Sequence, residues 1–358
     1  MKPTTLPLLS LPVLGLPLLA SSMTTNYEEG RSYAVSIASS SNTETDTELS
    51  MDGQPMEGRG NMGGPSERSF SCSYTDTVLT SDAGAPLRVR RSFDEIEGRS
   101  MVERRGEPVE SEQDSAFEGL TLVLEEVDGE VQITVEDGDE PEPERLDGFG
   151  LTLMLDALLP EDDVEVGGTW EVEASAFETA LAAGMAGRIM DRPAPPEGGE
   201  GRRGRGRRRG GEQGRGGDAL ARLFSGDFEW TVEATLTDRT EEFGGVECVV
   251  ITLEAEMQGN VPERERTGGR RGGGGDAVRA PSTPAAGTVS VELEGELLWN
   301  TKQDFPARLT VTGTVESEER RSRETERGYF EMNRSSTTEV ETTIEIAVPT
   351  GDDDESDD

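Results

Sequence analysis

The chain has 358 residues, a formal net charge of −40 and a sequence pI near 4.3. Such a negative surface repels nucleic acid and anionic lipid, so neither is an expected partner. The chain contains no histidine, which excludes Ser-His-Asp and Cys-His catalysis and histidine-ligated zinc and leaves only carboxylate, Tyr, Ser, Arg or Cys chemistry.

Residues 1–22 have the features of a secretory signal peptide. Lys2 precedes an apolar stretch that ends at Ala20, and Ala20 and Ser22 are small residues at the spacing that signal peptidase requires. The stretch is too short, and too interrupted by proline, to span about 30 Å of hydrocarbon as a stable helix. We therefore expect an exported protein, periplasmic or extracellular, without a lipid anchor and without a transmembrane span in the mature chain. An uncleaved anchor is the alternative.

Composition divides the remaining chain into six parts. Two of them are rich in arginine and glycine, cannot bury enough apolar area to offset chain entropy, and are expected to be disordered. An RNA-binding role for the first is disfavoured by the export signal and the net charge, which leaves a flexible linker or a segment that folds back onto the acidic body. The predicted parts are an N-terminal β region with helices (23–192), the first arginine-rich linker (193–217), a β hairpin (218–258), the second such loop (259–287), the C-terminal strands (288–349) and an acidic tail (350–358).

Period-two alternation of apolar and polar residues predicts long β strands along most of the chain. Asp128-Gly129 stands between two alternating runs and predicts a type I′ hairpin turn, because both turn positions need a positive φ. Residues 81–86 and Gly244-Gly245 predict two further hairpins. We therefore predict a mainly β protein whose long antiparallel strands form a half-barrel or sandwich.

One or two helices are expected to pack against these strands. Leucine and methionine spacing over 151–159 predicts a first helix that stops at Pro160. A second is predicted from Ser175 to Ile189, because Ser175 and Glu178 have capping-box spacing.

The two cysteines, Cys72 and Cys248, both lie in strand-like runs. In an exported protein an even count suggests a disulfide, which here would tie the two halves of the chain together. Two buried free thiols are the other interpretation.

No residue is predicted to be catalytic, to bind a cofactor or to ligate a metal. Trp170, Trp230 and Trp299 are candidates for contact with a ligand, although tryptophans on strands are more often core anchors. Acidic clusters at 137–140 and 161–163 lack the spacing of a twelve-residue calcium loop, so diffuse binding of counterions is expected there.

The chain resembles a loose group of exported bacterial β-rich proteins for which no activity is established. The likeness rests on Val-x-Val-Gly-x-x-Trp at 164–170 and on a late hairpin, 297–315, with Asp-Phe-Pro between its strands. The long-strand layout also looks like the open half-barrels of periplasmic lipoprotein carriers, which hold acyl chains. We therefore expect a non-enzymatic envelope protein that binds a hydrophobic ligand or a protein partner in a β concavity. A carboxylate-dependent hydrolase acting outside the cytoplasm is the alternative.

Overall fold

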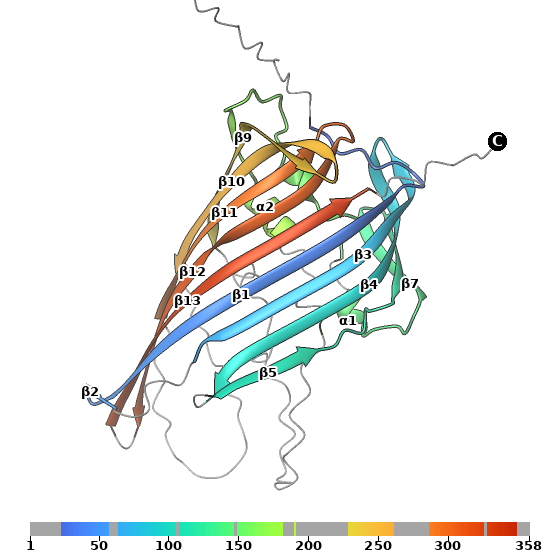
Figure 1. Ribbon diagram of the computed structural model, residues 1–358. Coiled ribbons are helices and arrows are strands. Elements are labelled where there is room, and N and C mark those ends of the chain that lie inside the picture. The colour runs from blue at the N-terminus through green and yellow to red at the C-terminus, as the bar shows by residue number, and fades with distance from the viewer. Residues whose placement is uncertain are drawn as a thin grey trace, which may run out of the picture.

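The computed structural model is a single large antiparallel β sheet with short helices on one face (Figure 1). This confirms the prediction of a mainly β fold with long antiparallel strands, and the strands form one open sheet. The predicted signal peptide, the first arginine-rich linker, residues 261–285 of the second predicted loop and the acidic tail lie outside the described residues, and the ends of that second loop belong to strands. The structure describes residues 23–56, 64–104, 107–146, 149–181, 190, 228–260, 286–325 and 328–348.

The sheet has 13 strands, and eight of them are at least 15 residues long, far above the usual five or six. The first half contributes β1 (Ser32–Met51), β2 (Gln54–Pro55), β3 (Ser66–Asp82), β4 (Ala85–Arg104), β5 (Glu107–Gln113), β6 (Thr121–Val127) and β7 (Glu130–Asp137). The second half contributes β8 (Thr169–Glu171), β9 (Glu229–Phe243), β10 (Val246–Asn260), β11 (Ala286–Asn300), β12 (Phe305–Thr325) and β13 (Gly328–Ala347).

Two meanders build this sheet and meet along one seam. The strand order is β7-β6-β4-β3-β1-β13-β12-β11-β10-β9-β8, with β2 beside β1 and β5 beside the far half of β4. The seam pairs the first long strand with the last, from Ala34 opposite Ala347 to Met51 opposite Phe330. The blue strand β1 and the red strand β13 accordingly run side by side through the middle of Figure 1.

The three predicted hairpin turns are present. Asp128 and Gly129 both have positive φ, 55° and 81°, as a type I′ turn requires. Gly244 and Gly245, with φ of 59° and 77°, connect β9 to β10 in the same manner. The turn within 81–86 centres on Ala83 and Gly84 and connects β3 to β4.

Alternation along the strands places one set of side chains in a continuous core on the inner face of the sheet. This core receives apolar residues from both meanders, and the helices and the connecting segments between β7 and α2 cover part of it. In Figure 1 α1 (Pro143–Leu146) and α2 (Ala174–Leu181) lie behind the sheet, so the view is onto its outer face.

The helix predicted over 151–159 does not form, and the one predicted from Ser175 to Ile189 is described as α2, Ala174–Leu181, with 182–189 outside the described residues. Within 151–159 only a short 3₁₀ turn forms, η1 (Leu155–Leu158), because Met154 before it has a φ of 55° and cannot continue a right-handed helix. The second helix begins at Ala174, one residue before the expected cap. The carbonyl of Glu173 accepts its first hydrogen bonds, from Ala176 and Phe177 N–H, so Ser175 lies inside the helix and not at its cap.

No helix among the described residues is long and apolar enough to cross a membrane.

Candidate functional site

The three tryptophans all belong to the inner core. Trp299 on β11 is 2 % exposed, and Trp230 on β9 packs against Phe177 of α2 with 6.1 Å between ring centroids. Trp170 on β8 is half-buried and donates its indole N–H to the Leu158 carbonyl at 3.0 Å. None of the three lines either of the two described cavities. Ligand contact by these residues stays a prediction, and the structure gives each of them a packing role.

The two cysteines lie in separate apolar clusters, and both thiols are free. Cys72 on β3 belongs to the inner core, whereas Cys248 on β10 belongs to a small second cluster with Val250, Leu298 and Ala307. Five strand spacings separate β3 from β10, or about 24 Å along the sheet, whereas a disulfide needs Cα atoms within about 7 Å. The predicted disulfide is therefore not formed in this structure. Burial raises the pKa of the Cys72 thiol to about 12, and burial also raises that of Cys248.

An ion pair that the sequence analysis missed lies inside the inner core. Arg91 on β4 donates from Nε and Nη2 to the two carboxylate oxygens of Asp76 on β3, at 2.7 and 2.8 Å. Nη2 also reaches the Leu151 carbonyl at 3.3 Å, and the guanidinium stands over the Tyr74 ring at 4.6 Å. Burial raises the pKa of the Asp76 carboxyl, and the two charge-assisted bonds from Arg91 oppose that shift. The contacts of Arg91 are therefore all with other groups of the protein, which is typical of a buried ion pair with a structural role.

Beside this pair the inner face has a cavity of about 20 Å³, lined by residues that include Tyr27, Tyr33, Asp76 and Phe305. Tyr27 meets Tyr33 and Phe305 edge to face, and burial raises its pKa well above its usual range. A space of this size holds about one water molecule and no acyl chain.

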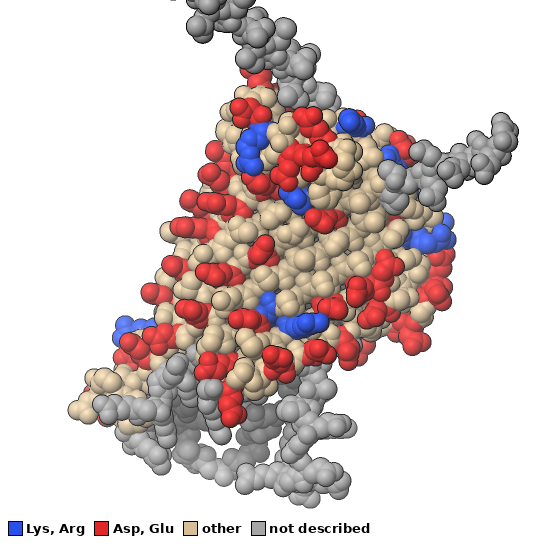
Figure 2. All heavy atoms as spheres, viewed as in Figure 1, with Lys and Arg blue, Asp and Glu red and all other residues tan. Residues whose placement is uncertain are grey.

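The larger hollow lies on the opposite, outer face. A trough of about 390 Å³ crosses β4, β3, β1 and β13, and it is lined by residues that include Ala38, Ser40, Ser69 and Ser71. On their strands these residues alternate with the positions of the buried Ile37, Phe70 and Cys72, so their side chains point away from the inner core. In Figure 2 acidic side chains cover much of this face, and a band with few charges crosses its middle. We call the lining of this hollow, Ala38, Ser39, Ser40, Ser69, Phe70, Ser71, Glu97, Arg99, Glu341 and Thr343, the serine trough.

Charged side chains of both signs border the serine trough. Arg99 pairs with Glu97 on β4 at 3.4 Å, and Glu341 stands on β13 at the far side. Three strand spacings, about 14 Å of backbone, separate the strands of Glu97 and Glu341. Paired carboxyls that hydrolyse glycosides stand about 5–9.5 Å apart. This border therefore lends no support to the hydrolase alternative.

No group of three or more His, Cys, Asp or Glu side chains that would hold a metal ion occurs in the described part of the chain. Sequence reasoning missed the serine trough. Its signal is the pair of serine and alanine runs at 36–41 and 69–73, where small residues, all serine except Ala38, occupy every outward position of adjacent strands.

No family model and no curated protein matches this chain. Among solved structures it is similar to OccK2 (OpdF) of Pseudomonas aeruginosa in complex with glucuronate, at a TM-score of 0.18 and 6 % identity over 86 % of this chain and 98 % of that one. A Pseudomonas aeruginosa FadL homologue gives 0.16 and 8 % identity over 92 % and 96 % of the two chains. The toluene transporter TodX of P. putida gives 0.16 and 7 % over 90 % and 93 %. TM-scores this low indicate neither the fold nor the function of this chain.

Proposed function

We propose that the chain is an exported, non-enzymatic envelope protein that binds a protein partner through the outer face of its sheet. The observation that carries this proposal is the serine trough, the larger of the two described hollows. Export is supported by the sequence of residues 1–22, which has the charge, length and small residues of a signal peptide.

The chemistry of the serine trough suits a short polar stretch of polypeptide. The backbone groups of its four strands are engaged with one another, so a partner meets side-chain hydroxyls, which both donate and accept hydrogen bonds. Its volume of about 390 Å³ lies within the range of about 300–1,000 Å³ that is usual for ligand sites. Small side chains on its floor allow a partner's chain to approach the sheet closely, and Glu97, Arg99 and Glu341 provide charges at its borders.

The inner concavity offers less support for a hydrophobic ligand. Its described cavity holds about one water molecule, and the tryptophans that would line a groove are packed against protein. We therefore place the binding surface on the outer face and not in the concavity.

Site-specific photo-cross-linking in the native host tests the proposal. A benzophenone side chain replaces Ser40 or Ser71, which line the serine trough, and Ser290 on β11 in a matched control. Ser290 also points outward, but its cross-strand neighbours are Glu316 and Gln258, away from the trough. We expect a discrete cross-linked adduct from Ser40 and Ser71 and none from Ser290, with the protein recovered outside the cytoplasm and lacking its first residues.

Two results would contradict the proposal. One is a cytoplasmic protein with an intact amino terminus. The other is an adduct pattern that is the same at all three positions, which would mean that the outer face makes only unspecific encounters.

A further inference from the structure

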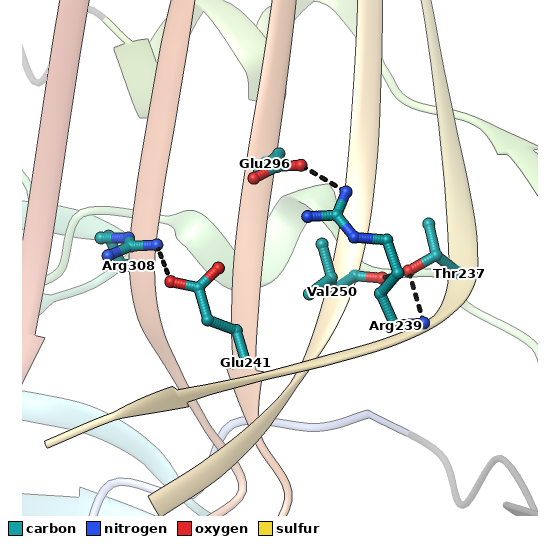
Figure 3. A network of polar contacts seen from close by, with 6 residues as sticks. All are labelled: Thr237, Arg239, Glu241, Val250, Glu296 and Arg308. Atoms are coloured by element: carbon teal, nitrogen blue, oxygen red, sulfur yellow. Dashed lines mark hydrogen bonds and ion pairs between the residues drawn. The ribbon is translucent and has the colours of Figure 1, made fainter. Parts of the chain in front are cut away.

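The tip of the β9–β10 hairpin departs from the regular sheet. Leu236 stands opposite Ile251, yet Thr240 stands opposite Val249, so β9 uses two more residues than β10 between these pairs. Extra residues on one strand bend it and increase its twist. In Figure 3 the bent hairpin passes in front of the neighbouring strands, on the outer face.

Thr237 stabilises this bend through both functions of its hydroxyl. Its Oγ1 donates to the Val250 carbonyl at 2.7 Å and accepts from the Arg239 N–H at 3.2 Å. The Thr237 side chain therefore supplies hydrogen bonds to backbone groups at the bend, where the ladder register is broken. All of these residues are labelled in Figure 3.

Two ion pairs attach the tip to strands beyond its own partner. Arg239 donates to Glu296 of β11 at 2.7 Å, and Arg308 of β12 donates to Glu241 at 2.5 Å (Figure 3). The Arg308 guanidinium also stands over the Phe243 ring at 5.5 Å. Two strands lie between β9 and β12, so Glu241 meets Arg308 because the tip folds across the outer face.

Under the tip lies the second apolar cluster. Cys248, Val250 and Leu298 are fully buried, Ala307 is 4 % exposed, and Phe243 packs against them. These side chains form a cluster of their own, separate from the inner core on the other face of the sheet. The tip is what keeps water from this part of the outer face.

We propose that residues 239–247, which precede the first β10 residue paired with β11, form a strap that lifts from the outer face while the sheet stays folded, and thereby uncovers the Cys248 thiol and the apolar cluster. The strap is attached more weakly than the sheet on which it lies. Two partly exposed ion pairs and a few apolar side chains attach the strap to the sheet. Each such ion pair contributes little to the free energy that keeps the strap in place. The sheet beneath it is fastened by the whole inner core. Regions with few buried contacts open locally before the protein unfolds.

The two cysteines make the opening measurable. Cys248 lies under the strap and Cys72 lies in the inner core, so one protein carries both the probe and its internal reference. The experiment measures modification of each thiol by a maleimide in the native full-length protein, resolved by peptide mass spectrometry. We expect Cys248 to react at least about tenfold faster than Cys72, because opening of the strap is easier than global unfolding.

A pair of arginine variants tests the fastening. Arg308→Gln removes the ion pair with Glu241 and the contact with the Phe243 ring. We expect it to speed modification of Cys248 by about three- to tenfold, as fits loss of one partly exposed ion pair and one cation–π contact, and to leave Cys72 unchanged. Arg320→Gln is the matched control. Arg320 lies on the same strand as Arg308, β12, but it pairs with Glu331 of β13, away from the strap. This variant should change neither rate.

Equal rates for the two thiols in the unmodified protein would overturn the proposal, since both would then report global unfolding. So would an Arg308→Gln variant that accelerates both thiols by the same factor. Should Arg308→Gln destabilise the whole fold, Arg239→Gln gives the second measurement, because it removes only the pair with Glu296.

Discussion

Arg91 shows how one buried charge organises its surroundings. It is 2 % exposed, and its guanidinium is used by the Asp76 carboxylate, the Leu151 carbonyl and the Tyr74 ring. The contact with Leu151 joins β4 to the segment that covers the inner face. Replacing both members of a buried ion pair by apolar residues is often neutral for stability, whereas removing one member is costly. Comparing the two kinds of substitution therefore shows how far Arg91 depends on Asp76.

Asp76→Asn should lower the free energy of unfolding by about 3–5 kcal/mol, because it leaves the Arg91 charge buried without a counter-charge. The double variant Asp76→Leu/Arg91→Met removes both charges and should lose much less. Urea denaturation of the three proteins measures the difference. A single variant as stable as the double one would show that Arg91 does not depend on Asp76.

Gly245→Val should also destabilise the protein, by about 1–2 kcal/mol, because a β-branched residue is strained at the φ of 77° that this turn position needs. Gly245→Asn is the matched variant, since asparagine tolerates left-handed φ and should retain most of the stability. Thermal unfolding compares the two. Equal melting temperatures would mean that the turn relaxes to another geometry.

Departures from simple alternation of apolar and polar residues indicate two features of the structure. Asp76 and Arg91 fall on the apolar face of alternating runs, which is the sign of a paired buried charge. The run from Cys248 to Ile251 is apolar at four successive positions, and all four are buried, so both faces of β10 are covered there. A strand with one wet face would not be apolar at successive positions.

The elements of the second meander carry a row of like charges. Glu233, Glu254 and Glu294 stand directly opposite one another on β9, β10 and β11, and Glu256 faces Glu292 beside them. These side chains are exposed, and the structure describes no ion pair for them among the residues that it covers. Like charges directly opposite across strands destabilise a sheet.

Glu254→Lys should therefore raise the free energy of unfolding at low ionic strength by about 0.5 kcal/mol, since it places a positive charge between two carboxylates. Glu318→Lys on β12 changes the net charge equally, but its cross-strand neighbours are Thr288 and Ser335. Urea midpoints of the two variants compare local pairing with net charge. The same gain in both would assign the effect to net charge alone.

Turns were predictable at the element scale, and strand partners were not. The turns at 128–129 and 244–245 depend on the φ of adjacent residues, which the sequence expresses locally. That β1 pairs with β13 depends on the whole chain, and the periodicity of a strand says nothing of its neighbour. The helix predicted over 151–159 does not form, because Met154 has a left-handed φ and the buried Leu155 and Leu158 form only a short 3₁₀ turn in the core.

At the scale of the whole molecule, the net charge of −40 sets the response to salt. Self-repulsion between carboxylates opposes the compact state, and ions screen it once the Debye length falls towards about 10 Å. We expect the melting temperature to rise as ionic strength increases from about 0.01 M to about 0.1 M. The rise should be smaller for Glu254→Lys than for the unmodified protein. A melting temperature that falls with salt would mean that attractive ion pairs outweigh the repulsion.

The pairing of β1 with β13 has a consequence for the order of assembly. Each meander grows from hairpins between strands close in sequence, but the middle of the sheet closes only when the last strand of the chain arrives. Until then β1 and β12 present long unpaired edges, which are open to pairing with other chains. Contacts so distant in sequence also slow folding. A chain that lacks β13 would lose the joint between its halves, and we expect it to aggregate rather than to form a smaller version of the same sheet.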